Sequence, residues 1–201
     1  MDVIIHYLII SLAVIIVMTV MGFSKAYTSY KLGDVAIKNI GKVSLNPKRH
    51  FEILGFIMFV FFGYGWTAPI DTSSVYYKDR KKGNLLVSIV PFIVAFICAF
   101  ICSIIYKIDI LPNFSSTLGI LFIKFIVCNI FPIYPFFGQK LFQTVLPSNK
   151  AIKLAQYDKM LQIAFIFLLF SGFFQRFLDM LSLFILNIIF LPISFIISGV
   201  M

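Results

Sequence analysis

The side chains that most often carry out chemistry in proteins are few in this chain. The two histidines stand at positions 6 and 50. Two imidazoles that bind one zinc ion from a helix stand one turn apart, so His6 and His50 cannot form such a pair. Cys98, Cys102 and Cys128 lie inside apolar runs, which is typical of small buried hydrophobic side chains. The sequence therefore predicts no metal site and no cofactor.

The remaining polar candidates are isolated. Ser24 and Lys25 are adjacent, so on a helix they point in different directions and cannot act as a Ser–Lys pair without a second segment. His50 lies in a basic loop, where a turn-stabilising hydrogen-bond donor is expected rather than a ligand. Lys124 lies among apolar residues, and we consider two interpretations for it: a functional group inside the membrane, or a side chain that reaches the nearby interface.

The composition is that of a membrane protein. Of the 201 residues, 61% are hydrophobic and 12% are charged, and the mean hydropathy is +1.01. A soluble domain of this size cannot bury so much apolar surface. The net charge of +9 is expected to set the topology and to contact anionic lipids. No basic stretch is interleaved with aromatic residues outside the apolar runs, so nucleic acid is not an expected partner.

The fold class that these patterns predict is an all-α polytopic membrane protein with five to six transmembrane helices. Residues 66–75 are expected to form a short membrane-embedded strand, or part of a re-entrant hairpin with the short segment that precedes them. The apolar segments span residues 3–24, 53–64, 85–106, 117–132, 160–174 and 180–197.

The distribution of basic residues favours one topology. Residues 53–64 are too short for an ordinary spanning helix, which needs about 20 residues. If they enter the membrane and return, residues 25–50, 76–84 and 139–159 all face the cytoplasm, as the positive-inside rule requires. We therefore expect five spanning helices and a re-entrant hairpin, with the N-terminus outside and the C-terminus inside. Six plain spans are the alternative.

Four stretches, in this order, resemble the bacterial site-2 proteases, a family of intramembrane zinc metalloproteases. They are AYTSYKLGD at 26–34 with GKVSLNPKRHFEILG at 41–55, FGYGWTAPID at 62–71, the basic KDRKKGNLLVSIVPF at 78–92, and NIFPIYPFFG at 129–138. The resemblance covers residues 14–142. It implies a bacterial cytoplasmic membrane protein with a core over residues 1–142, followed by a C-terminal pair of transmembrane helices over residues 143–201.

The residues that would perform the family's chemistry are replaced. In the register that the motifs set, the zinc-binding and general-base positions of the family's H-E-x-x-H motif fall on Met21, Gly22 and Lys25, and the third zinc ligand falls on Phe137. Thioether, hydrogen, ammonium and phenyl groups cannot replace imidazole and carboxylate at a catalytic zinc. We expect Phe137 to fill the space of the metal, to pack against Met21 and to accept the Lys25 cation on its ring face.

The resemblance and these replacements together suggest a catalytically inactive homologue, a pseudoenzyme that binds or regulates another membrane protein or a transmembrane peptide. The alternatives are an active intramembrane zinc metalloprotease with atypical ligands and a small transporter or channel subunit. Its binding cleft is expected between the 62–71 stretch and the broken end of the 117–132 segment. The candidate cleft residues are Trp66, Thr67, Pro69, Lys124, Asn129, Pro132, Tyr134, Pro135 and Gly138.

Overall fold

All regular structure in the described part of the chain is helical. The computed structural model describes the backbone of residues 2–198 and the side chains of residues 3–147 and 149–189. The helices are α1 (Asp2–Lys31), α2 (Val35–Asn39), α3 (Ile53–Phe62), α4 (Arg80–Lys107), α5 (Pro112–Asn129), α6 (Phe137–Val145), α7 (Ser148–Gln156), α8 (Asp158–Phe170) and α9 (Gly172–Ser198), with 3₁₀ turns at Pro47–Arg49 and Ser74–Tyr76. The predicted all-α class is confirmed.

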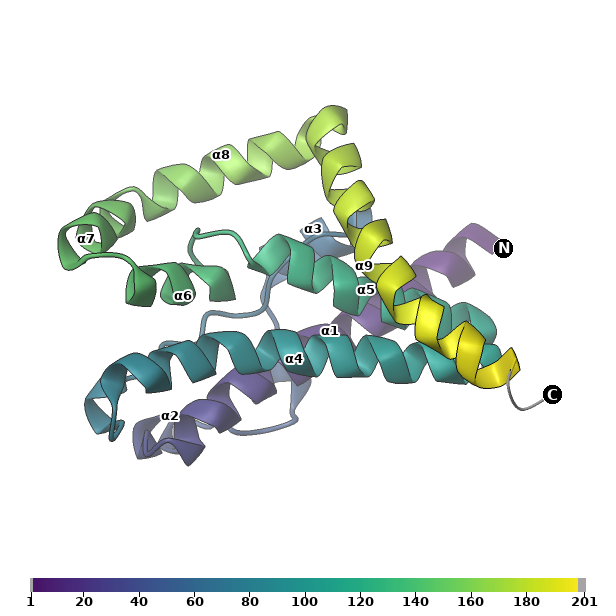
Figure 1. Cartoon of the computed structure of the whole chain (residues 1–201). Helices are drawn as coiled ribbons and strands as arrows, with labels where there is room; N and C mark the ends of the chain where they lie inside the picture. The colour runs from purple at the N-terminus through teal and green to yellow at the C-terminus, as the bar shows by residue number, and fades with distance from the viewer. Residues whose placement is uncertain (1, 199–201) are drawn as a thin grey trace.

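The core lies between the long helices α1, α4 and α5, which pack against one another (Figure 1). Their facing sides are apolar, and α3, α6 and α9 add further side chains to the same cluster. Its largest fully buried members are Met18, Met21, Phe59, Phe122, Phe125, Ile123 and Phe137. Small residues such as Ala95 and Ala99 on α4 allow the helices to approach closely, as small residues do between membrane helices.

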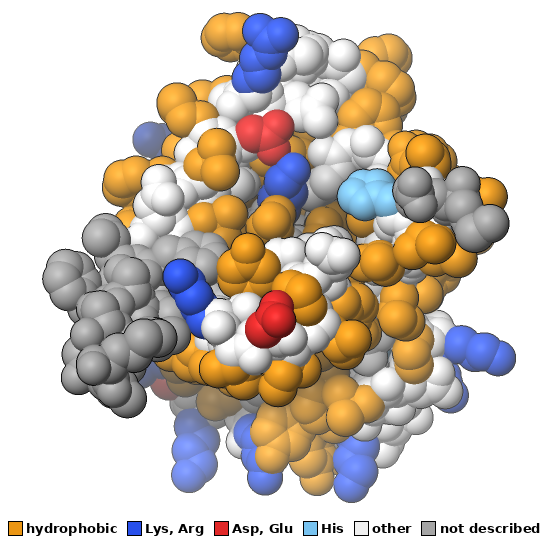
Figure 2. All heavy atoms as spheres, turned by 90° about the vertical axis from the view of Figure 1, so that its right-hand side faces the viewer, with side chains coloured by type: hydrophobic (Ala, Val, Ile, Leu, Met, Phe, Trp, Pro, Cys, Tyr) orange, Lys and Arg blue, Asp and Glu red, His pale blue; other side chains and the backbone are white. Residues whose placement is uncertain are grey.

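Among the described residues, three helices are long and apolar enough to cross a membrane: α1, α4 and the described part of α9. Large apolar side chains also cover much of the outer surface, as Figure 2 shows for one face. Phe167 and Phe173, for example, are 72% and 82% exposed. Such a surface is stable only against lipid, so the protein is a helical membrane protein.

The segment at residues 53–64 forms the ten-residue helix α3. The Glu52 carboxylate accepts hydrogen bonds from the amides of Leu54 and Gly55 at its start, and Gly63 ends it in the left-handed conformation with φ 76°. Glycine adopts this conformation without a steric penalty. Ten residues rise about 15 Å, half the hydrocarbon thickness, so α3 is too short to cross.

The expected strand at residues 66–75 is absent: most of this stretch carries no regular structure, and it ends in a 3₁₀ turn at Ser74–Tyr76. A strand needs a partner for its backbone groups, and the described part of the chain offers none.

The basic stretches lie toward one end of the molecule, and the start of α1 and the end of α9 lie toward the other (Figure 1). In Figure 1, α2, the start of α4, α6 and α7 lie on the left, whereas the start of α1 and the end of α9 lie on the right. We expected the two chain ends on opposite sides. Helix α8 has 13 residues, fewer than a full span requires; the chain turns at Ser171 and continues as α9. The number of spans and the side of each loop stay predictions.

Candidate functional site

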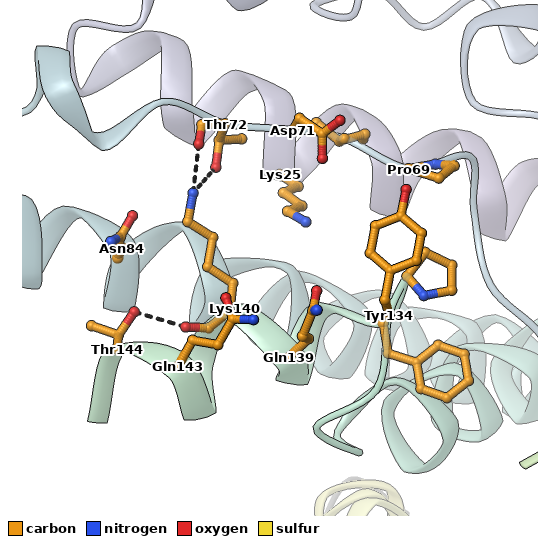
Figure 3. A pocket seen from close by; sticks show the side chains of 13 residues that line it. Lys25, Pro69, Asp71, Thr72, Asn84, Tyr134, Gln139, Lys140, Gln143 and Thr144 are labelled. Atoms are coloured by element: carbon orange, nitrogen blue, oxygen red, sulfur yellow. Dashed lines mark hydrogen bonds between the residues drawn. The ribbon is translucent and has the colours of Figure 1, made fainter. Parts of the chain in front are cut away.

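A cavity of about 290 Å³ opens at the basic end of the molecule, between α1, the start of α4, α6 and the segment at residues 69–72 (Figure 3). It takes its polar lining from four separate parts of the chain. The lining residues are Lys25, Pro69, Ile70, Asp71, Thr72, Asn84, Tyr134, Pro135, Phe136, Gln139, Lys140, Gln143 and Thr144. A concave site with converging polar groups is the usual form of a ligand-binding site.

Lys25 of α1 is buried beside this cavity. Its side chain is 5% exposed, and its Nζ atom lies 4.7 Å from the centre of the Phe137 ring. Phe137 is itself 1% exposed and belongs to the same apolar cluster as Met21. The expected contact between the Lys25 cation and the Phe137 ring is therefore confirmed, and it brings one face of α1 against the start of α6.

Gly22 on α1 is covered by the imidazole of His50. A Cβ atom at Gly22 would lie 2.3 Å from His50 Nδ1, so only glycine fits here. His50 is fully buried, and its Nε2 donates to the Ser44 carbonyl at 2.7 Å. Its Nδ1 has no hydrogen-bond partner. Burial lowers the pKa of His50, which favours the neutral imidazole.

The residues at the positions that the resemblance assigns to zinc chemistry do not fit a zinc ion. Zinc in proteins takes about four nitrogen, sulfur or oxygen ligands, of which at least three come from side chains. Here Met21, Gly22, Lys25 and Phe137 supply a thioether and an ammonium, and His50 Nδ1 adds one free imidazole nitrogen. Among the described residues, no three His, Cys, Asp or Glu side chains gather in a group that could hold a metal ion.

The segment that lines the cavity at residues 69–72 is held at its two ends. Before it, the Ala68 amide donates to the His50 carbonyl at 2.8 Å. After it, the Ser73 amide donates to the Asp34 carboxylate at 2.9 Å. Between these bonds, the backbone groups of Ile70 and Asp71 make no hydrogen bond to any described residue. The segment thus has an unpaired edge beside the cavity.

Lys140 of α6 connects the opposite wall to this segment. Its Nζ donates to the Thr72 carbonyl at 2.7 Å and also to the Thr72 hydroxyl. Burial lowers the pKa of Lys140 to about 8, against the opposing attraction of Asp34 and Asp71. The ammonium is therefore less well solvated here than in water.

The lowered pKa of Lys140 makes stability depend on pH. The folded protein releases the Lys140 proton near pH 8, whereas the unfolded chain keeps it to about pH 10.5. Since the unfolded state binds more protons between these values, the stability should rise with pH from about 8 to 10.5. Thermal unfolding in detergent over this range checks it. We expect Lys140→Met to remove part of the rise and Lys78→Met, at an exposed lysine, to leave it; an equal slope in both variants would contradict the assignment.

The predicted cleft residues fall into three groups. Pro69, Tyr134 and Pro135 line the cavity. Trp66, Thr67, Asn129 and Gly138 are buried and form the structure behind it; the Asn129 side-chain amide, for instance, donates to the Gly65 carbonyl at 2.9 Å. Pro132 is half-buried in the connection after α5 and does not line the cavity.

Lys124, also among the predicted cleft residues, does not line this cavity. Its Nζ is 2.9 Å from the Asp179 carboxylate of α9 and 4.8 Å from the centre of the Tyr64 ring. Tyr64 in turn donates its hydroxyl to Asp179 at 2.8 Å. These contacts tie α5, α9 and the chain after α3 together. Asp179 lies between the predicted apolar segments 160–174 and 180–197, and it is part of the helix α9.

Sequence reasoning missed most of the polar lining. Asp71 and Thr72 lie in the stretch predicted as a strand, and Asn84, Gln139, Lys140, Gln143 and Thr144 lie in stretches that the sequence marks only as basic. One signal was present: on a helix, residues 139, 140, 143 and 144 fall on one face at i, i+1, i+4 and i+5. The helical pattern, with α6 starting at Phe137, would have placed all four on one side.

Comparison with known proteins gives one informative similarity. The chain is 29% identical over 175 residues to the Bacillus subtilis (strain 168) protein described as "Putative zinc metalloprotease YwhC", which covers 81% of this chain and 79% of that protein. No protein-family profile matches the chain, and no solved structure is significantly similar to it. The similarity extends beyond the four motifs and supports a site-2 protease-like relationship.

This relationship corrects one expectation. From the replaced residues we inferred a pseudoenzyme, that is, no enzyme. The relative is described as a zinc metalloprotease and matches most of the chain, which points to a protease. The inference failed because it gave four positions in one register more weight than the similarity of the chain as a whole.

Proposed function

We propose that this site-2 protease-like membrane protein receives an extended segment of another membrane protein in the cavity beside residues 69–72. The observation that carries the proposal is the unpaired backbone of Ile70 and Asp71, which runs along the cavity between two fixed ends. An extended peptide can pair with such an edge through its main chain, a common mode of peptide recognition.

The position of the cavity also suits a segment that comes from a membrane. The cavity lies between α1, a candidate membrane span, and the first turns of α4, another such span. Its far wall, α6, follows directly on the chain that leaves α5. A segment that leaves the bilayer as an unwound chain would therefore meet the free edge close to the ends of the spanning helices.

Site-specific photocrosslinking in native membranes tests the proposal. A photoreactive phenylalanine analogue replaces Tyr134, which lines the cavity. The matched control carries the same analogue at Tyr76, which is 58% exposed and lies outside the cavity. We expect the Tyr134 position to capture polypeptides whose crosslinked residues map to membrane-spanning or adjacent segments, and the Tyr76 position to capture far less. Capture of lipid alone at Tyr134, or equal capture at both positions, would contradict the proposal.

A further inference from the structure

The charge that lines the cavity is not balanced. Lys25 and Lys140 contribute two ammonium groups and Asp71 one carboxylate, so the lining carries one net positive charge. Asp34, the other carboxylate near Lys140, accepts hydrogen bonds from the Ser29 hydroxyl and the Ser73 amide at 2.9 Å each. Neither lysine forms an ion pair with a described carboxylate within 4.0 Å.

The Lys25 ammonium is the clearest unmatched group. It is 5% exposed, it donates no hydrogen bond to a described residue, and it lies over the face of the Phe137 ring. In Figure 3 its nitrogen points into the cavity, toward the space between Asp71 and Gln139. A buried ammonium without an acceptor is costly. A ligand oxygen in this cavity would remove that cost.

We propose that Lys25 and Lys140 bind a carboxylate group of the segment that docks in the cavity, either an Asp or Glu side chain or a C-terminal carboxylate. This inference rests on the proposed function, and it adds the chemical class of segment that the site selects. One carboxylate neutralises the single net charge of the lining. Hydrogen bonds between ammonium and carboxylate groups are about twice as strong as those between neutral groups.

Both lysines are held in position for this role. Lys140 donates hydrogen bonds to the Thr72 carbonyl and hydroxyl. An ammonium group has three N–H donors, so one N–H of Lys140 remains free for a ligand. The face of Phe137 fixes Lys25 from the other side. Burial lowers the pKa of Lys140 to about 8, and a bound carboxylate would favour its charged form. The free edge of residues 69–72 continues from the same cavity. The anion that the two lysines bind is therefore the carboxylate of a peptide and not the phosphate of a lipid.

The test uses synthetic apolar peptides of one sequence and the full-length protein in phosphatidylcholine nanodiscs. Four acetylated peptides are compared: free C-terminus, amidated C-terminus, amidated with one internal Glu, and amidated with Gln at that position. Fluorescence anisotropy measures their dissociation constants. We expect a peptide with a carboxylate to bind about tenfold tighter than its amide counterpart, the magnitude of one charge-assisted hydrogen bond. The comparison of the two carboxylate peptides identifies which source is preferred.

A Lys25 variant tests whether the effect depends on this lysine. Lys25→Met keeps the volume and the apolar stem, so it should fold at least as stably as the original protein, which thermal unfolding verifies. It should lower the affinity for the carboxylate peptides to that for the amides. The control Lys153→Met, at an exposed lysine of α7, should keep the preference.

The outcomes separate the two proposals. Equal binding of acid and amide peptides would overturn carboxylate recognition and leave peptide docking intact. No binding of any peptide would overturn the proposed function itself. If phosphatidylglycerol in the nanodiscs displaced the peptides through Lys25, the lysine pair would belong to a lipid phosphate, and the inference would be wrong.

Discussion

Phe137→Ala is expected to lower the free energy of unfolding by about 3–5 kcal/mol, the range for truncating a large buried aromatic side chain. Phe137 is 1% exposed, and its ring centre lies 5.3 Å from that of Phe125 and 6.4 Å from that of Phe92. Alanine would leave a cavity at the junction of α4, α5 and α6. It would also remove the aromatic ring that the buried Lys25 ammonium contacts.

Thermal and denaturant unfolding of the purified protein in detergent measures this effect. The matched control is Phe173→Ala, because Phe173 is 82% exposed and exposed substitutions change stability by about 0.5 kcal/mol or less. The combination Phe137→Ala with Lys25→Met should be less destabilised than Phe137→Ala alone, since no ammonium is then left without a partner. A stability loss for Phe137→Ala no larger than that of the control would contradict the packing described for α6.

Gly22→Ala is expected to destabilise the protein by about 1–3 kcal/mol, the range for overpacking a well-packed core. Alanine in place of glycine inside a helix normally stabilises by about 1 kcal/mol, so the expected sign is the reverse of the ordinary one. The added Cβ would lie 2.3 Å from Nδ1 and 2.7 Å from Cγ of His50. His50 cannot withdraw freely, because its Nε2 donates to the Ser44 carbonyl and its own carbonyl accepts from Ala68.

A control and a double-mutant cycle test this contact. Gly172→Ala adds a Cβ with nothing within 4 Å and should be neutral or slightly stabilising. In a His50→Ala background, Gly22→Ala should lose most of its cost, with a coupling energy of about 0.5–3 kcal/mol for residues in contact. Additive effects of the two substitutions would mean that Gly22 and His50 do not touch.

The sequence predicted the long helices better than the site, and the reasons are physical. Uninterrupted apolar runs identified α1 and α4, although both helices extend beyond the runs, to Lys31 and from Arg80. Polar residues at the ends of membrane helices stay helical because the interface satisfies their side chains. The same effect hid the start of α9, where Gln175, Arg176 and Asp179 are helical. The predicted segment 53–64 matches α3 closely, since α3 begins at Ile53 and ends at Phe62, directly before Gly63.

The site could not be assembled in the same way, because its contacts join residues far apart in the chain. Nothing in the sequence pairs Gly22 with His50, or Thr72 with Lys140. The contact of Lys25 with Phe137 was predicted because the motifs placed both residues near one position in space. The unpaired edge at Ile70 and Asp71 was expected as a possible strand, and the structure shows why it does not form one: it has no partner within the described chain.

Amide hydrogen exchange with a bound peptide tests the central claim, that an incoming segment pairs with residues 69–72, most directly. The amides of Ile70 and Asp71 make no hydrogen bond to a described residue, so they should exchange quickly in the free protein. Saturation with the apolar peptide that carries one Glu should slow the exchange of at least one of them by a factor of about ten or more, because strand pairing protects amides. The amides of Ala68 and Ser73, which are already bonded, should change little. Full occupancy by the peptide without added protection at residues 70 and 71 would contradict this account.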